Sequence, residues 1–333
     1  MLLSSSRRFG AFVIAALTAA ALILPARAAD KLSVLPIDWA YYNPFSLVLR
    51  DNHWMEQEFA KDGTRIQWVL SLGSNKALEL LNGDSVKFGS SAGAAALMAK
   101  ANGVPIKAVY IYSKPEWTAL VVRKDSPIHT VEDLKGKRIA VTRGTDPHIF
   151  LLRALALHGM TSRDVKMVLL QHPDGKVALI RGEVDAWAGL DPYMAQTELE
   201  DGSRLFFRDP DLNTYGFLNV REDFAKAHPD IVERVLTVYE RARIWSLAHP
   251  AALRAIVAKA ARLSDAVAAK QLERNDLSSG LIGKKQRDTI VAAGAVLKQS
   301  GVIPANTDID KTADALIDPQ YITRVLAHKE AAK

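Results

Sequence analysis

Apolar residues recur along the first 220 residues with two alternating periods, one typical of buried strands and one typical of amphipathic helices. Short apolar runs predict strands at residues 32–37, 64–71, 86–90 and 106–113. Helical stripes predict helices at residues 44–62, 75–82 and 92–101, whose N-caps are expected at Asn43, Ser74 and Ser91. This alternation predicts a mostly parallel sheet with helices on its faces.

A second strand–helix series follows and leads into a helical tail. Its strands are expected at residues 118–123, 138–142, 165–170, 185–189 and 205–208, and its helices at 147–158, 175–181 and 192–200. A return strand is expected at 215–220, and the pattern from residue 221 onward is almost wholly helical. Because about 300 residues exceed what one hydrophobic core usually serves, we expect two lobes. The tail would pack on the first lobe and make that lobe discontinuous.

The first 28 residues have the pattern of a secretory signal peptide. Arg7 and Arg8 precede an apolar run at residues 9–24, and the small residues Ala26 and Ala28 suit cleavage after Ala28. The arginine pair also fits twin-arginine export, but the aromatic residue behind it stands one place early for that pattern. Ordinary export is therefore favoured.

The chain contains no cysteine, which excludes disulfides, thiolate metal sites, a thiol nucleophile and a lipoprotein anchor. An exported protein with neither a lipid nor a membrane span is retained only inside an outer envelope, which predicts a periplasmic location. All 37 acidic residues and 40 of the 43 basic ones lie beyond residue 28, so the exported chain carries +3. This mild charge gives no case for nucleic acid. The eight histidines show no metal-binding spacing, and we expect no metal and no cofactor.

One segment combines a short strand, a glycine turn and a helix that starts with proline. Residues 138–142 are the strand, Gly144 allows a sharp turn, and Thr145 or Asp146 can cap the helix that contains Pro147. The free N–H groups of the first helical turn and the positive end of the helix dipole attract anions. The segment therefore indicates an anion site, although such junctions also occur in αβ proteins that bind nothing there.

The order of four segments resembles that of a known family. These segments are GSNKALELLNGDSVKFGSSAGAAALMAKANG at 73–103, WTALVVRKDSPI at 117–128, VEDLKGKRIAV at 131–141 and GEVDAWAGLDPY at 182–193. They are similar to segments of periplasmic solute-binding proteins of ABC importers, in particular the group that binds aliphatic sulfonates, taurine and nitrate. The resemblance extends from residue 32 to about residue 303.

The resemblance implies an α/β, two-lobed periplasmic binding protein fold of type II, in which each lobe is a mostly parallel sheet flanked by helices and two strands form the hinge. Lobe 1 would comprise residues 30–116 and 221–333, and lobe 2 residues 117–220. The lobes would close on one small organic anion, a sulfonate, at the carboxyl ends of strands. The closed monomer would deliver this ligand to the membrane subunits of the transporter.

Three predicted helix starts would converge on the cleft between the lobes and offer N–H and hydroxyl donors to a sulfonate. They are Gly73, Ser74 and Asn75; Ser90, Ser91 and Ala92; and Gly144, Thr145 and Asp146. The hydroxyl residues also suit plain N-caps, and the two roles can coexist. Arg143 is expected either to grip the anion or to remain solvated or salt-bridged. We interpret Asp146 as a cap, because an inward carboxylate would repel an anion, and His148 as an exposed or modest polar contact.

Aromatic residues are candidates for the wall around the organic part of the ligand. Trp39, Tyr41 and Tyr42 follow the first strand, where the resemblance places the ligand loop. Trp187 and Asp191 are further candidates, although an aromatic residue within a strand belongs to the core more often than to a site. Unpaired in the cleft, Asp38 would favour a cationic or amine-bearing ligand, whereas a paired Asp38 would carry no information.

The predicted function is capture of an organosulfonate without chemistry. The alternatives within the same fold are binding of nitrate, taurine or an amine-bearing metabolite. The fold also resembles the pyrimidine synthases of thiamine biosynthesis, but those enzymes carry a cysteine-rich motif and this chain has no cysteine. A signal peptide in place of a DNA-binding helix pair argues against the effector lobe of a regulator. We therefore expect a binding protein that is not an enzyme.

Overall fold

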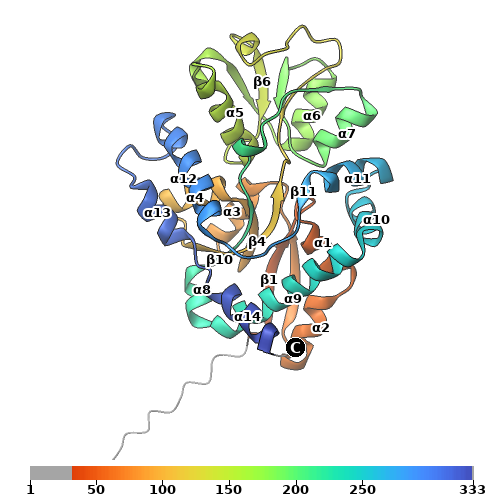
Figure 1. The fold of residues 1–333 in the computed structure, drawn as a ribbon, viewed down its shortest axis with the longest axis vertical. Helices are drawn as coiled ribbons and strands as arrows, with labels where there is room; N and C mark the ends of the chain where they lie inside the picture. The colour runs from red at the N-terminus through yellow and green to blue at the C-terminus, as the bar shows by residue number, and fades with distance from the viewer. Residues whose placement is uncertain (1–31, 332–333) are drawn as a thin grey trace, which may run out of the picture. The chain divides into compact units, whose positions relative to one another are not determined.

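The computed structural model describes residues 32–331, so the predicted signal peptide lies outside the described residues. Two β-sheets with helices on their faces make up this part of the chain (Figure 1). In order across the six-stranded sheet, the strands are β11 (Asn275–Asp276), β4 (Ile106–Pro115), β10 (Gly216–Arg221), β3 (Phe88–Ala92), β1 (Val34–Trp39) and β2 (Arg65–Leu70). In order across the five-stranded sheet, they are β7 (Lys166–Leu169), β6 (Arg138–Val141), β8 (Ala186–Ala188), β5 (Leu120–Val122) and β9 (Arg204–Phe207).

Both sheets are mixed. In the six-stranded sheet β1 runs parallel to β2 and β3, whereas β10 is antiparallel to β3 and β4. In the five-stranded sheet β6 runs parallel to β7 and β8, whereas β5 is antiparallel to β8 and β9. The predicted parallel pairing thus holds inside each strand–helix series. The antiparallel strands are β5 and β10, which follow the two passages between the sheets, and the short edge strand β11, which pairs with β4.

The helices follow the predicted order and fill the tail. In chain order they are α1 (Pro44–Asp51), α2 (Trp54–Phe59), α3 (Ser74–Asn82), α4 (Gly93–Ala101), α5 (Asp146–Leu157), α6 (His172–Ile180), α7 (Tyr193–Glu200), α8 (Glu222–Ala227), α9 (Pro229–Ala248), α10 (Pro250–Ala261), α11 (Asp265–Glu273), α12 (Lys284–Gln299), α13 (Ile309–Leu316) and α14 (Gln320–Ala331). Within residues 32–331, no helix is long and apolar enough to cross a bilayer.

Several element boundaries differ from the prediction, and two of these differences change the interpretation. The single helix expected at residues 44–62 is interrupted, because His53 adopts a left-handed conformation with φ 56° between α1 and α2. The strand expected at residues 86–90 is β3, which continues to Ala92. The reason is its pairing with β10, in which Phe217 lies opposite Ser91 and Gly216 opposite Ala92. Ser90 and Ser91 therefore belong to a buried strand and not to a helix start.

Separate apolar clusters hold the two sheets. The largest contains side chains such as Phe45, Phe88 and Tyr110, which are inaccessible to solvent around the six-stranded sheet. On the five-stranded sheet, Leu120 belongs to the cluster on one face and the next residue, Val121, to the cluster on the other. This alternation is what a strand covered on both faces requires. In Figure 1, α5, α6 and α7 lie beside the five-stranded sheet.

Two chain segments connect the sheets, residues 116–119 between β4 and β5 and residues 208–215 between β9 and β10. Helices also pack across from one sheet's elements to the other's: α5 contacts α4 and α12, and α7 contacts α11. The lobe boundaries at about residues 117 and 220 remain a prediction. Because α5 packs on α4, the loops that precede helices in the half with the six-stranded sheet lie near those in the half with the five-stranded sheet.

Candidate ligand-binding site

The two predicted glycine loops meet the opposite half of the molecule. A methyl group placed on Gly73 would lie 3.0 Å from Nε2 of His172, and one placed on Gly144 would lie 3.5 Å from both Cβ of Asn75 and Cε of Met98. Gly144 has φ 82°, a conformation that side-chain-bearing residues rarely adopt. We call these five residues the junction, because they bring α3, α5 and α6 together at their amino ends.

Helix starts at the junction carry free donors. The first N–H groups of a helix have no partner within the helix. Among residues 32–331, the N–H groups of Ser74, Asn75, Asp146 and His148 make no hydrogen bond. Together with the helix dipoles, these groups produce a positive potential that suits an anion.

The third predicted helix start, at Ser90, Ser91 and Ala92, does not offer free donors. The N–H of Ala92 donates to Oγ of Ser74 at 2.9 Å, and the next two N–H groups donate to Tyr215 O at 2.8 Å and Thr214 Oγ1 at 3.2 Å. The chain itself thus satisfies the start of α4. Ser74 is also not the N-cap of α3, a position that Gly73 occupies.

The third helix start at the junction is that of α6. It was not identified from the sequence. His172 is fully buried, its Nδ1 lies 3.1 Å from Oγ1 of Thr142, and its Nε2 faces Gly73 without a partner among the described residues. Burial lowers the pKa of His172 to about 3, so the ring is neutral. The signal available in the sequence was the pair His172-Pro173, because proline is favoured in a first helical turn.

His148 and Arg143 lie beside each other at the start of α5. His148 is buried, so the exposed alternative of the prediction is wrong, and its Nδ1 has no partner within residues 32–331. Burial, and secondarily the charge of Arg143, lower the pKa of His148 to about 4. Arg143 itself is exposed, and it forms no ion pair with another described residue. Its guanidinium is thus a cation beside a neutral imidazole.

Asp38 is the fifth of the six residues of β1, lies opposite Val69 of β2, and is fully buried. Its carboxylate accepts hydrogen bonds from Ser71 Oγ at 2.7 Å, Ser90 N–H at 2.8 Å and Ser90 Oγ at 2.9 Å. Tyr42 donates its hydroxyl to Ser90 O at 3.0 Å in the same network. Burial raises the pKa of Asp38 to about 6, although these hydrogen bonds act in the opposite direction. Asp38 is paired and therefore gives no indication of a cationic ligand.

Asp146 is not the cap of α5, which corrects the prediction. Thr145 occupies the N-cap position, and its hydroxyl donates to Thr142 O at 2.7 Å. The Asp146 carboxylate instead accepts hydrogen bonds from Trp117 Nε1 at 2.8 Å and from the N–H and hydroxyl of Thr214 at 2.9 and 2.7 Å. We call this arrangement the Asp146 clasp. It fastens the start of α5 to both segments that connect the sheets.

The predicted aromatic and acidic candidates are dispersed. The guanidinium of Arg50 lies 3.7 Å from the Trp39 ring, and that ring lines a hollow of about 410 Å³ between α1 and α10. Tyr41 packs edge-on against Trp39 at 5.4 Å. Trp187 is fully buried in a core cluster of the five-stranded sheet, as the core alternative held. None of these rings belongs to the junction as defined.

Asp191 connects the two halves at another point. It is buried, accepts the N–H of Ala195 at 2.8 Å, and lies 3.3 Å from the guanidinium of Arg274, which also pairs with Glu198. Burial raises the pKa of Asp191 to about 6, and the pairing with Arg274 opposes this shift. No sequence pattern indicated Arg274 as the partner of Asp191, because it lies far along the helical tail.

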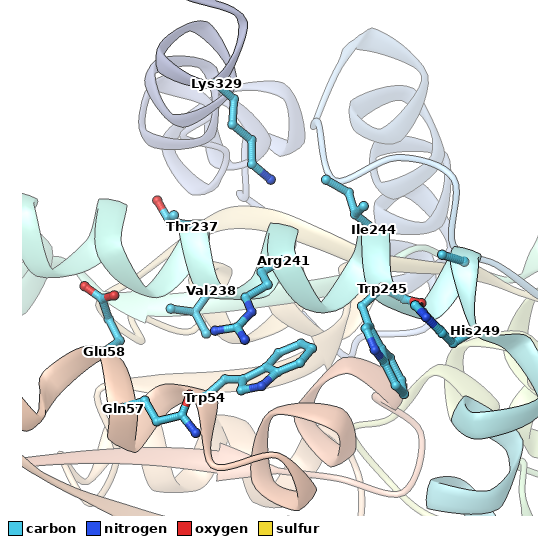
Figure 2. Close-up of a pocket in the computed structure, with 11 residues that line it drawn as sticks. Trp54, Gln57, Glu58, Thr237, Val238, Arg241, Ile244, Trp245, His249 and Lys329 are labelled. Atoms are coloured by element: carbon cyan, nitrogen blue, oxygen red, sulfur yellow. Dashed lines mark hydrogen bonds between the residues drawn. The ribbon is translucent and has the colours of Figure 1, made fainter. Parts of the chain in front are cut away.

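A separate hollow of about 720 Å³ lies between α2 and α9 (Figure 2). Its wall includes Trp54 and Trp245, whose rings meet edge-on at 5.9 Å, and Arg241, whose guanidinium lies 3.9 Å from the Trp54 ring. No predicted site residue lines this hollow. The convergence of helix starts with unpaired buried polar atoms makes the junction the better candidate.

The chain has the periplasmic binding protein fold. This class is defined by two sheets that are flanked by helices and connected by two chain segments. An alkanesulfonate-binding protein from Xanthomonas axonopodis pv. citri, solved with MOPS bound, matches with a TM-score of 0.79 over 87% of this chain and 100% of its own, at 26% identity. The predicted fold class is thereby confirmed. The chain belongs to the NMT1/THI5-like family, whose model matches residues 59–253.

Curated relatives include both binding proteins and an enzyme. Putative aliphatic sulfonates-binding proteins match at 32% identity over 63% of this chain in Escherichia coli and at 28% over 61% in Bacillus subtilis. A 4-amino-5-hydroxymethyl-2-methylpyrimidine phosphate synthase of Aspergillus parasiticus matches at 26% over 58% of this chain and 61% of its own length. The alignments span 66% and 62% of the two binding proteins, which is less than two thirds of each.

Proposed function

We propose that this protein is the solute-binding component of an ABC import system, that it acts in the periplasm, and that it captures an organosulfonate at the junction. One observation carries the proposal: the starts of α3, α5 and α6 converge there with free N–H groups and neutral imidazoles. A sulfonate is ionised at every physiological pH, so it requires donors and no proton acceptor. The names of the sulfonate-binding relatives support the same ligand class.

The disposition of the acidic groups favours an anion. Asp38 and Asp146 are buried, and each accepts three hydrogen bonds from groups within the chain. Neither carboxylate is hydrogen-bonded to a free N–H group of the helix starts, so those donors remain for a ligand. Arg143, exposed beside His148, adds a positive charge on the same side.

In this proposal residues 30–116 and 221–333 form one lobe and residues 117–220 the other. The ligand contacts α3 on one side and α5 and α6 on the other. Because it therefore binds the closed form more tightly than the open form, it stabilises the closed form. The membrane subunits of the transporter then recognise the closed surface of the monomer. No chemical step is needed, and no cysteine is available for the chemistry of the pyrimidine synthases.

A thermal unfolding screen tests the proposal. The purified protein is heated with alkanesulfonates, taurine, sulfate, nitrate or a neutral sugar. A ligand at a hundred times its Kd adds about 2.7 kcal/mol to the free energy of unfolding, which raises the midpoint by a measurable amount. We expect the shift with sulfonates only. A shift with nitrate alone, or with the neutral sugar alone, would refute the organosulfonate assignment.

A further inference from the structure

Two hydrogen-bond acceptors face the same point of the junction from opposite halves. A methyl group on Gly73 would lie 2.9 Å from Oδ1 of Asn75 and 3.0 Å from Nε2 of His172. Both atoms are buried, and neither has a hydrogen-bond partner within residues 32–331. A buried polar atom without a partner costs roughly 1–3 kcal/mol, so a pair of them indicates that a partner comes from outside the chain.

The hydrogen-bond network of the described residues determines the tautomer of His172. Thr142 has one hydroxyl hydrogen, and it donates this hydrogen to Leu170 O at 2.7 Å. The contact of 3.1 Å between Thr142 Oγ1 and His172 Nδ1 must therefore be a hydrogen bond from Nδ1–H to the hydroxyl oxygen. A neutral ring that carries its proton on Nδ1 has a lone pair on Nε2. The His172 atom that faces Gly73 is thus an acceptor.

The missing partner is a donor, and the surroundings favour an uncharged one. An ammonium group held by two neutral acceptors in a buried place would lack a counter-ion, which is costly. The carboxylates of Asp38 and Asp146 are bonded to other donors and make no hydrogen bond to Asn75 or His172. Asp174, in the first turn of α6, is exposed and therefore screened by solvent. A hydroxyl group satisfies an acceptor without needing a counter-ion.

We propose that the ligand is a hydroxyalkanesulfonate, whose sulfonate lies at the helix starts and whose hydroxyl donates to Asn75 Oδ1 or His172 Nε2. A second hydroxyl or a water molecule donates to the other acceptor. The inference rests on the proposed function and narrows its substrate class. It makes Asn75 and His172 the residues that distinguish hydroxylated sulfonates from plain ones.

Three sulfonates of equal size test the inference by calorimetry. They are 2-hydroxyethanesulfonate, taurine and propane-1-sulfonate, which differ only in a terminal hydroxyl, ammonium or methyl group. An unmet buried acceptor weakens binding by roughly 10- to 100-fold, so the hydroxyl compound should bind that much more tightly than the methyl compound. Taurine should also bind more weakly than the hydroxyl compound.

The other outcomes separate this inference from the proposed function. Equal affinity for the hydroxyl and methyl compounds would overturn the inference and leave a sulfonate-binding protein. Tighter binding of taurine would show that an ammonium group is recognised, which also overturns it. If none of the three binds to protein that still unfolds cooperatively, the proposed function fails and the inference falls with it.

Variants of Asn75 assign the effect to the junction. Asn75→Leu removes one acceptor, so the preference for the hydroxyl over the methyl compound should fall at least fivefold. Asn75→Asp keeps the shape of the side chain and adds a counter-ion for an ammonium group. The affinity for taurine should therefore rise relative to the affinity for the hydroxyl compound. Asn82→Leu, on the exposed end of the same helix, is the matched control and should change neither ratio. An unchanged preference in Asn75→Leu would refute the role of this residue.

Discussion

The Asp146 clasp gives the sharpest test of how the connecting segments are held. The change is Asp146→Ala, which removes a buried carboxylate that accepts hydrogen bonds from Trp117 Nε1 and from the N–H and hydroxyl of Thr214. The small replacement leaves these three donors enclosed in the protein without an acceptor.

Each buried donor left without a partner costs roughly 1–3 kcal/mol. Because the segment can relax in part, we expect Asp146→Ala to lower the free energy of unfolding by about 3–6 kcal/mol. Asp146→Asn keeps the shape and one acceptor oxygen but turns an amide N–H₂ toward donors, so a loss of about 1–3 kcal/mol is expected. Both losses are large against the 5–15 kcal/mol that is typical of a folded protein.

Urea unfolding at pH 7 measures these losses, with the denaturant slope as a check that both variants unfold in the same way. Asp174→Ala is the matched control, because Asp174 also stands in the first turn of a helix but is exposed. It should cost less than about 1 kcal/mol, the contribution of a charge near a helix dipole. Equal losses for Asp146→Ala and Asp174→Ala would show that the clasp contributes nothing beyond the dipole.

Further predictions concern the loop, the buried histidine and the buried ion pair. Gly144→Val should abolish sulfonate binding and cost about 1–2 kcal/mol in stability, whereas Gly159→Val, whose φ is also positive but whose surroundings are open, should cost as much and leave binding intact; calorimetry and urea unfolding separate the two. The folded-state pKa of His172, about 3, lies below its ordinary 6.5, so its stabilising contribution is complete above pH 6.5 and decreases as the pH falls. Between pH 7 and pH 5 the parent protein should therefore lose about 2 kcal/mol more than His172→Gln, and equal losses in urea unfolding would contradict the burial of this ring. Arg274→Met leaves a buried carboxylate unpaired and should cost about 3–5 kcal/mol, against about 0–1 kcal/mol for Arg208→Met at a more exposed pair; similar melting temperatures for both would refute this difference.

Local patterns predicted most of the fold, because strand and helix periods depend on neighbouring residues. The order of strands and helices follows the expected one, with α6 three residues longer at its start than predicted. The errors arise from distant contacts: β3 continues to Ala92 because β10, more than a hundred residues later, pairs with it. The break between α1 and α2 depends on the left-handed backbone of His53. Glycine is the usual sequence signal for this conformation, and no glycine is adjacent to His53.

The candidate site was predictable only in its backbone. Gly144 was proposed because glycine allows a sharp turn before a helix, and Gly73 because the family resemblance places its helix start at the cleft. Side-chain roles were not, since each depends on a remote partner: Asp146 bonds to Thr214, and Asp191 pairs with Arg274. His172 was missed because its role requires both Thr142 behind it and Gly73 in front.

The position of β10 has a consequence for how the chain assembles. This strand lies between β4 and β3 in the middle of the six-stranded sheet, yet it follows the whole five-stranded sheet in the chain. A chain that emerges with its amino end first therefore exposes unpaired edges of β3 and β4 until residues 216–221 arrive, whereas residues 120–207 can complete their sheet without waiting. Unpaired strand edges attract other chains, and pairing across such long separations is slow. The five-stranded sheet, whose strands are synthesised after the first strands of the six-stranded sheet, can therefore complete its pairing first.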